Sequence, residues 1–225
     1  MSNEHTFVTP GPAGLGALAV ACFGFGAVFA GKVTLGGLPL LAAWLIGGGV
    51  VQYTVAVMEL KDHNMTGGNV FLFFAAFFMF GAALSVLSKY LMLSGIIGSV
   101  KPESMVEGFC WMAGASFLTA VTPAYLKSPL PLFVLVILLD IALWLIVGLD
   151  MGLLGAGMKP LVAYLLYASG WVGIYPVEER IDGLRKLLGI PSHVIPLSLV
   201  SVGNPAEKKE PPARFKPERI HYDRW

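Results

Sequence analysis

Two polar side chains in one apolar stretch have the types and the spacing of a functional pair. Gln52 and Glu59 lie seven residues apart, so a helix through them would place both on one face, two turns from each other. A polar corner at 61–64 and a glycine pair at 67–68 follow, before the chain becomes apolar again. Two interpretations of Glu59 stay open: a carboxylate that extends to the membrane surface from the end of a span, or a structural or gating group in the corner.

Asp140 lies near the middle of another apolar run, 130–149. A carboxylate at mid-depth in a membrane is costly unless it is protonated, paired or hydrated, which makes such a residue a candidate proton site or other polar functional site. The alternative is a structural hydrogen bond to a neighbouring helix. The sequence leaves both interpretations open.

The histidines and cysteines indicate neither a metal centre nor an enzyme. All four histidines lie outside the apolar runs, and the two cysteines fall in different runs without a ligand-type motif. Cys22 and Cys110 are therefore predicted to be buried small hydrophobic residues, as free cysteines commonly are. On this basis we expect no catalytic residues, no metal and no cofactor.

The composition is that of a membrane protein followed by a polar tail. Apolar residues make up 56% of the chain and charged residues 13%, with a mean hydropathy of +0.74, whereas a soluble protein carries about 25% charged residues. Of the fifteen Lys and Arg residues, six lie in 1–175 and nine in 176–225. We therefore expect a transmembrane body over 1–175 and a soluble tail over 176–225. The net charge of +1 gives no electrostatic argument for nucleic acid binding.

Six apolar segments must position these polar residues. They cover 13–30, 40–60, 69–93, 109–126, 130–149 and 161–175. A helix that crosses the hydrocarbon core needs about 20 residues, and a single helix satisfies its own backbone hydrogen bonds in lipid. The sixth segment, with fifteen residues, is short for a full crossing. The chain is thus predicted to be an all-α integral membrane protein, a six-helix transmembrane bundle with a short sixth helix and a polar C-terminal tail.

Local signals refine three of these segments. Pro10 is predicted at the first helical position of the first segment, where its missing N–H costs little. Ser104 and Glu107 have the spacing of a capping box before the fourth segment. An aromatic stripe with helical spacing runs through the third segment: Phe71, Phe74 and Phe78. Such a stripe faces lipid, fills a core or forms a gate, and the spacing does not decide among these roles.

Three groups of residues have the order and spacing of a known family. The first helix begins with Thr9-Pro10-Gly11-Pro12-Ala13-Gly14-Leu15. The glutamine helix, the corner and an aromatic pair follow in register as Gln52, Glu59, Asn64, Gly67, Phe71 and Phe77. The sixth segment carries Gly170-Trp171-Val172-Gly173. Over residues 9–173 these motifs resemble the acetate/succinate uptake transporter family, the succinate–acetate permeases, with Thr9, Gly11 and Ala13 as departures from the first motif of that family.

The resemblance implies both an architecture and a function. Such proteins are expected to form six-helix protomers, each with its own pathway, assembled as a hexamer in the cell (inner) membrane with both termini in the cytoplasm. They are expected to move acetate, and in some members succinate, as proton-coupled permeases or anion channels. The nine basic residues of the tail agree with the cytoplasmic placement. The implied partners are a small carboxylate, the lipid bilayer and further copies of the chain.

The same resemblance assigns roles to single residues. Gln52, Asn64 and Thr119 are implied as hydrogen-bond donors for a carboxylate head. Leu18, Phe74 and Leu139 match a hydrophobic constriction, and Phe71 is included in the pathway. A structural or hinge role is implied for Pro10, Gly11, Pro12, Gly14, Leu15, Glu59 and Gly67.

A second resemblance covers the end of the chain. Residues 171–180, 187–191, 193–197 and 220–225 resemble the C-terminal end of FMN-dependent nitroreductases. Nothing in 1–170 resembles the flavin-binding parts of those enzymes, so no flavin is expected. The chain would then be a fusion or chimera of two families. The alternative to transport is a non-transporting membrane scaffold or sensor that uses this tail for oligomer or partner contacts.

Overall fold

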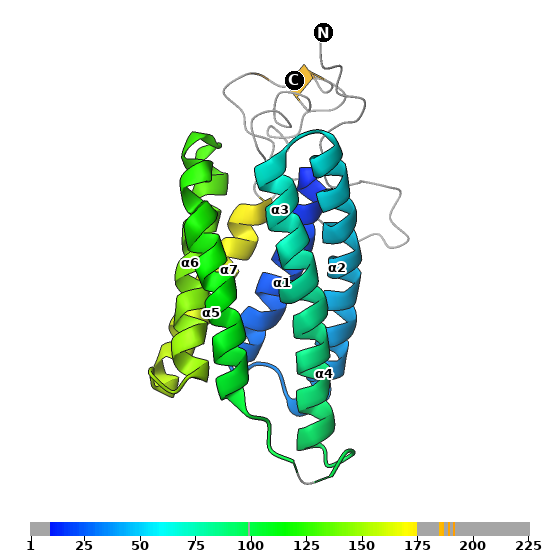
Figure 1. Cartoon of the computed structure of the whole chain (residues 1–225), viewed down its shortest axis with the longest axis vertical. Coiled ribbons are helices and arrows are strands. Elements are labelled where there is room, and N and C mark those ends of the chain that lie inside the picture. The colour runs from blue at the N-terminus through cyan, green and yellow to red at the C-terminus, as the bar shows by residue number, and fades with distance from the viewer. Residues whose placement is uncertain (1–9, 99, 175–184, 187–188, 190, 192–225) are drawn as a thin grey trace, which may run out of the picture. The chain divides into compact units, whose positions relative to one another are not determined.

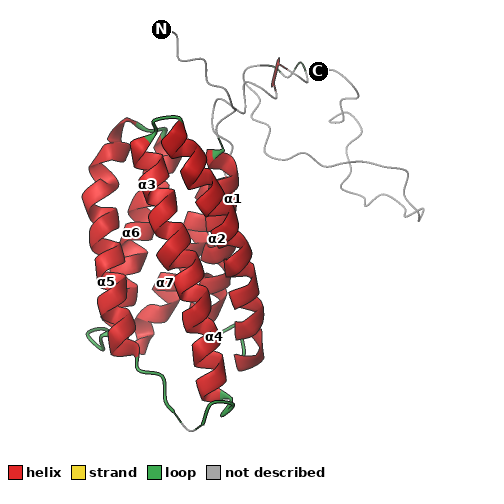
Figure 2. Ribbon diagram, turned by 45° about the vertical axis from the view of Figure 1, so that its right-hand side comes forward, coloured by secondary structure: helices red, strands yellow, loops and turns green. Residues whose placement is uncertain are grey.

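The computed structural model describes residues 10–98, 100–174, 185–186, 189 and 191. The regular elements throughout this part of the chain are helices (Figure 1, Figure 2). The chain divides into one unit at Met1–Ile174 and another at Tyr175–Trp225. Helices α1 to α7 all belong to the first unit. The predicted tail, 176–225, lies almost entirely outside the described residues, so its separate fold stays a prediction.

Six helical rods form the bundle. They are α1 (Gly11–Phe29), α2 (Leu38–Lys61), the rod of α3 (Met65–Phe73) and α4 (Ala82–Leu93), α5 (Ser104–Val121), α6 (Leu130–Asp150) and α7 (Lys159–Ile174). A π-helical stretch, Phe74–Gly81, joins α3 to α4 without a break. Short 3-10 turns precede α2 and α7 at Leu35–Gly37 and Ala156–Met158, and another follows α5 at Thr122–Lys127.

Five rods are long and apolar enough to cross a membrane. Within the described residues these are Gly11–Phe29, Leu35–Lys61, Met65–Leu93, Ser104–Lys127 and Leu130–Asp150. The sixth rod, α7, has 16 residues, fewer than the roughly 20 of a full crossing. Proline lies in the first turn of α1, α2 and α6, where no backbone hydrogen bond is lost. The prediction of an all-α membrane bundle of six helices is confirmed. The short sixth helix stays a prediction, because residues 175–184 lie outside the described part of the chain.

The rods surround a common axis. α1 packs between α2 and α7, α7 also contacts α6, α6 contacts α5, and α2 contacts the α3–α4 rod. The ring of Phe73 in α3 stacks on that of Phe117 in α5, with centroids 4.2 Å apart, and so closes the circle. Both views place α5 and α6 on one side of the bundle and α2 on the other (Figure 1, Figure 2).

Glycines let α1 and α7 approach each other closely. A Cβ atom on Gly26 would lie 2.6 Å from the Tyr167 ring, and one on Gly170 would lie 2.9 Å from the Phe23 ring. Small residues permit such approach in lipid, where van der Waals contact drives helix association.

Replacing Gly170 with alanine is expected to destabilise the bundle by about 1–3 kcal/mol, because the added methyl group forces the Phe23 ring or the helix to move. Gly16→Ala, on α1, is the matched control, since no atom lies within 4 Å of its Cβ position. The measurement is the thermal unfolding midpoint of both variants in detergent. Equal midpoints would contradict the close packing of α1 on α7.

Two local predictions differ from the structure. Pro10 is the N-cap of α1, with φ −81° and ψ −6°, so the helix begins one residue later, at Gly11. α5 begins at Ser104 after Glu103, which makes no side-chain cap hydrogen bond, so the predicted capping box is wrong. The reason is that Glu107 contacts the neighbouring α4 instead, where its carboxylate accepts hydrogen bonds from Ser85 and Lys89.

The burial prediction for the cysteines is half right. Both are free, and Cys22 is buried, but Cys110 on α5 is exposed. In a membrane helix the outward-facing positions are as apolar as the inward-facing ones. An apolar run therefore does not tell which of its members are buried.

Candidate functional site

One side chain holds the corner between α2 and α3. The Asn64 side-chain oxygen accepts a hydrogen bond from the Gly67 N–H at 3.1 Å and caps α3, while its Nδ2 donates to the Glu59 carboxylate. Glu59 is only 5% exposed. The Glu59 carboxylate therefore does not extend to the membrane surface. Its contact with Asn64 is that of a structural group in the corner. A gating role for this carboxylate stays a prediction.

Gln52 joins α2 to the beginning of α1. Its Nε2 donates to the Gly14 carbonyl oxygen at 3.3 Å, and the side chain is 1% exposed. Its Oε1 is buried and has no hydrogen-bond partner among the described residues. A Cβ atom on Gly14 would lie 2.5 Å from the Phe71 ring, so glycine at this position lets α1, α2 and α3 meet.

These residues border a cavity of about 370 Å³, which we name the hinge cavity. Six of the seven predicted pathway residues line it: Leu18, Gln52, Asn64, Phe71, Phe74 and Leu139. Four residues of the predicted structural set also line it: Gly11, Leu15, Glu59 and Gly67. The remaining three, Pro10, Pro12 and Gly14, shape the beginning of α1. The fold thus gathers positions from α1, α2, α3 and α6 that are far apart in the chain.

A second cavity, of about 510 Å³, lies at the other end of the same helices. We name it the charged cavity, after its polar lining residues Ser85, Lys89, Ser104, Glu107, Asp150 and Lys159. The Lys89 ammonium group forms an ion pair with the Glu107 carboxylate, which also accepts a hydrogen bond from Ser85. The Ser104 hydroxyl donates to the Asp150 carbonyl oxygen at 3.0 Å.

The two cavities lie along one line through the bundle. On α1 the hinge cavity is lined by Gly11, Leu15 and Leu18, and the charged cavity by Phe25, Val28 and Phe29. On α6 the corresponding sets are Leu132, Leu135, Val136 and Leu139, then Ile146, Leu149 and Asp150. Residues three, four or seven positions apart share a helix face. The same faces of α1 and α6 therefore line both cavities.

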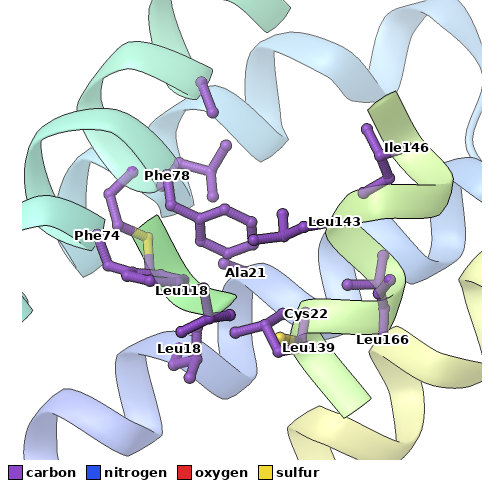
Figure 3. Packing of buried hydrophobic residues seen from close by; sticks show 14 of the residues in the cluster. Leu18, Ala21, Cys22, Phe74, Phe78, Leu118, Leu139, Leu143, Ile146 and Leu166 are labelled. Carbon is purple, nitrogen blue, oxygen red and sulfur yellow. The ribbon is translucent and has the colours of Figure 1, made fainter. Parts of the chain in front are cut away.

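A buried apolar layer separates the two cavities, and Figure 3 shows how its side chains pack. Its members, which we name the constriction, are Leu18, Ala21, Cys22, Phe74, Phe78, Leu118, Leu139 and Leu143, each at most 5% exposed. Leu18, Phe74 and Leu139 border the hinge cavity, and Phe78 borders the charged cavity. In the aromatic stripe, Phe74 and Phe78 thus fill the centre of the bundle, and Phe71 is half-buried beside the hinge cavity.

Thr119 and Asp140 line neither of these cavities. The Thr119 Oγ1 lies 2.8 and 3.0 Å from the two carboxylate oxygens of Asp140, and it accepts a hydrogen bond from Trp144 Nε1 at 3.0 Å. Asp140 follows Leu139, and one residue turns a helix by about 100°, so Leu139 faces the axis while Asp140 faces outward. In this fold Asp140 makes a hydrogen bond to a neighbouring helix, α5, which is the structural alternative given by the sequence. Thr119 is separated from the other six predicted pathway residues.

The charged cavity was missed by sequence reasoning. Lys89, Glu107, Asp150 and Lys159 are among the few charged residues of the transmembrane body, and each lies towards the end of an apolar segment. Ser85 and Lys89 are also four residues apart, which places them on one helix face. These signals indicate that polar side chains lie at one or both ends of the helical bundle. The pairing of Lys89 with Glu107 is a contact between two helices, and no spacing in the sequence indicates it.

The arrangement suits a small solute with a polar head and an apolar part. Polar groups are offered at both ends, and a layer of leucine and phenylalanine side chains closes the middle. Hydrophobic layers of this kind control passage by excluding water. In the described parts of the chain, no three His, Cys, Asp or Glu side chains are grouped to hold a metal ion.

Known proteins resemble the transmembrane body in sequence and in fold. A family model described as the GPR1/FUN34/yaaH family matches residues 1–177. A solved structure described as the bacterial acetate channel SatP is similar with a TM-score of 0.64 and 18% sequence identity, and the match covers 84% of this chain and 99% of that one. At this identity the likeness shows a common fold.

Two curated proteins match a short part of the chain, and both are named as NADH dehydrogenase/NAD(P)H nitroreductases. The one from Methanothermobacter thermautotrophicus is 47% identical over 55 residues, which are 24% of this chain and 29% of the relative. The one from Archaeoglobus fulgidus is 48% identical over 60 residues, which are 25% of this chain and 34% of the relative. The chain thus spans about a third of the length of these relatives. Their short matches are consistent with the resemblance noted for the tail.

The match to the family model includes all seven α-helices and therefore the whole of the site. The family indicated by the sequence motifs is confirmed by this match. The chain belongs to the GPR1/FUN34/yaaH family.

Proposed function

We propose that this multi-pass membrane protein carries acetate, and other small carboxylates such as succinate, across the bilayer as a proton-coupled permease or an anion channel. The observation that carries the proposal is the pair of cavities on one axis, separated by the constriction. A solute can enter from either end but must cross the apolar layer. The common fold with a bacterial acetate channel supports a small carboxylate as that solute.

The chemistry of acetate fits the two ends and the middle of this path. The carboxylate head needs hydrogen-bond donors or cations. The amides of Gln52 and Asn64 each carry a second N–H beyond the one already used, and Lys89 and Lys159 lie at the opposite end. The methyl group is compatible with the constriction. A bare charge is costly in an apolar layer, so the solute crosses either through a widened constriction or as the neutral acid.

We also propose a homo-oligomer, a hexamer as in the family resemblance, located in the cell (inner) membrane with both termini in the cytoplasm. The nine basic residues of 176–225 support the cytoplasmic placement of the C-terminus. The outward-facing carboxylate of Asp140 supports an oligomer, because lipid offers it no partner. A non-transporting scaffold or sensor gives no reason for two aligned cavities, so we do not favour it.

Uptake of labelled acetate into proteoliposomes tests the proposed function. Saturable uptake above that of protein-free liposomes, inhibited by excess succinate, is the expected result. An imposed pH gradient separates the two modes once the uptake of neutral acid by protein-free liposomes under the same gradient is subtracted, since the remaining uptake accelerates in acidic medium only if it is coupled to protons. The absence of saturable uptake by a folded preparation would overturn transport and favour the scaffold.

A further inference from the structure

We propose that Asp140, Thr119 and Trp144 form a docking site for a second copy of this chain, whose Tyr53 hydroxyl donates a hydrogen bond to the Asp140 carboxylate. The inference rests on the homo-oligomer proposed above and names the residues that join neighbouring copies. Asp140 is then a contact residue of the assembly and not a group that handles the solute.

The first argument is that Asp140 has too few donors within the described chain. The Thr119 hydroxyl carries one hydrogen, yet its oxygen lies near three acceptors: the two Asp140 oxygens at 2.8 and 3.0 Å and the Ala115 carbonyl at 2.9 Å. The Trp144 N–H is directed at Thr119. A carboxylate accepts about four hydrogen bonds. The described residues supply Asp140 with at most one, so a donor is missing.

The second argument is where this carboxylate lies. Asp140 is the eleventh of the 21 residues of α6, at the middle of a membrane span. Thr119 and Trp144 beside it are exposed on the outer surface of the bundle. Lipid chains carry no hydrogen-bond donors, and water is excluded at this depth. For the ionised carboxylate, the missing donor must therefore come from another protein surface.

The third argument identifies that surface as α2 of a second copy. α2 lies on the other side of the bundle from α5 and α6 (Figure 1, Figure 2). Its outer face exposes Ala43 and Gly47, four residues apart, which permits close approach of another helix. Tyr53 on this helix is 53% exposed, and its hydroxyl has no hydrogen-bond partner within the described residues. The two sides of the bundle are thus complementary, one with an unpaired donor and one with an acceptor that can take further hydrogen bonds.

Donor and acceptor also lie at similar depth. Tyr53 follows Gln52, and Asp140 follows Leu139. Gln52 and Leu139 line the same hinge cavity. A contact between two different faces, repeated from copy to copy, closes into a ring when the rotation between neighbouring copies is a whole fraction of a turn. A ring of this kind would cover every Asp140 with the Tyr53 of a neighbour.

The association of labelled copies in liposomes tests this contact. Fluorescence transfer measured at decreasing protein-to-lipid ratio gives the dissociation constant. Asp140→Leu and Tyr53→Phe are each expected to raise it about three- to tenfold, the effect of one hydrogen bond between membrane helices. The dissociation constant of the double variant is expected to be no higher than those of the single variants. Leu84→Ala, 63% exposed on α4, is the control without effect.

Chemical cross-linking tests the same contact without relying on stability. Cys22 and Cys110 are first replaced by alanine. Protein with Asp140→Cys is then mixed with protein with Tyr53→Cys and treated with a short bis-maleimide. Mixed dimers are expected from this pair, and none from Leu84→Cys with Tyr53→Cys. An oligomer that forms normally but shows no 140–53 cross-link, or is unaffected by Asp140→Leu, overturns the inference and leaves the proposed oligomer intact. A wild-type protein that stays monomeric overturns both, while the uptake assay still reports on transport.

Discussion

A Phe74→Ala variant is expected to carry acetate about tenfold faster than the wild-type protein and to admit larger carboxylates such as succinate more readily. Phe74 is 3% exposed and borders the hinge cavity within the constriction. Removing its ring shortens the apolar layer and lets water enter, which lowers the barrier for a charged head. A reduction of about 1.4 kcal/mol in that barrier gives the tenfold effect. The measurement is the initial rate of labelled acetate and succinate uptake into proteoliposomes.

The chain offers a matched control for this experiment. Phe77 is the same residue type three positions later, is 60% exposed, and lines neither the hinge cavity nor the charged cavity. Phe77→Ala is expected to leave the uptake rate unchanged. Phe74→Ala is also expected to lower stability, by about 3 kcal/mol for a ring removed from a packed core, so rates are compared per folded protein. If the two variants transported at the same rate, the constriction would not be the barrier.

An Asn64→Asp variant is expected to lose about 2 kcal/mol of stability, although aspartate caps a helix as well as asparagine does. The change keeps the oxygen that accepts the Gly67 N–H but removes the N–H₂ group that donates to the buried Glu59 carboxylate. It also places two carboxylates against each other. Protonation of either one relieves the repulsion and restores a donor. The stability of this variant is therefore expected to rise as the pH falls, measured as the unfolding midpoint in detergent from pH 8 to pH 5.

A double variant that exchanges the two side-chain types at positions 59 and 64 is the control for this prediction. In the double variant Glu59→Gln with Asn64→Asp, the amide and the carboxylate exchange places, so one side chain again donates and the other accepts. We expect most of the lost stability to return, and the pH dependence to disappear. A double variant no more stable than Asn64→Asp would show that the contact between these two side chains contributes little.

The sequence alone was sufficient to predict the helices and to indicate the family. A run of about twenty apolar residues has one solution in a bilayer, a helix that satisfies its own backbone. Most ends were therefore predicted to within two residues, as for α6, which begins at Leu130 and ends at Asp150, one residue past the prediction. The exceptions are α3, which begins at Met65, before the predicted 69, and α5, which is Ser104–Val121 where 109–126 was predicted. The motifs around Pro10, Gln52 and Asn64 depend on local order and spacing, and they indicated the family that the model match confirms.

Side-chain direction was decided by the tertiary structure. Leu139 and Asp140 are neighbours in the sequence, yet one faces the axis and the other the outer surface. In a soluble helix the polar side would identify the surface, but in a membrane both sides are apolar, and the pattern carries little information about rotation. For this reason Thr119 was placed in the pathway by resemblance, while the structure places it against Asp140 outside both cavities.

The sequence by itself thus determined the membrane class, the six helices and the polar corner, because each of these depends on composition or local spacing. The residues that gather at the hinge cavity were implied by the family resemblance. The tertiary structure decided how the faces of α1, α6 and the α3–α4 rod combine into two cavities with a closed layer between them. It also paired Lys89 with Glu107 at the far end of that line. Those features depend on the rotation and packing of one helix against another. Rotation and packing are determined by interactions between helices, and such interactions produce no periodic pattern in the sequence.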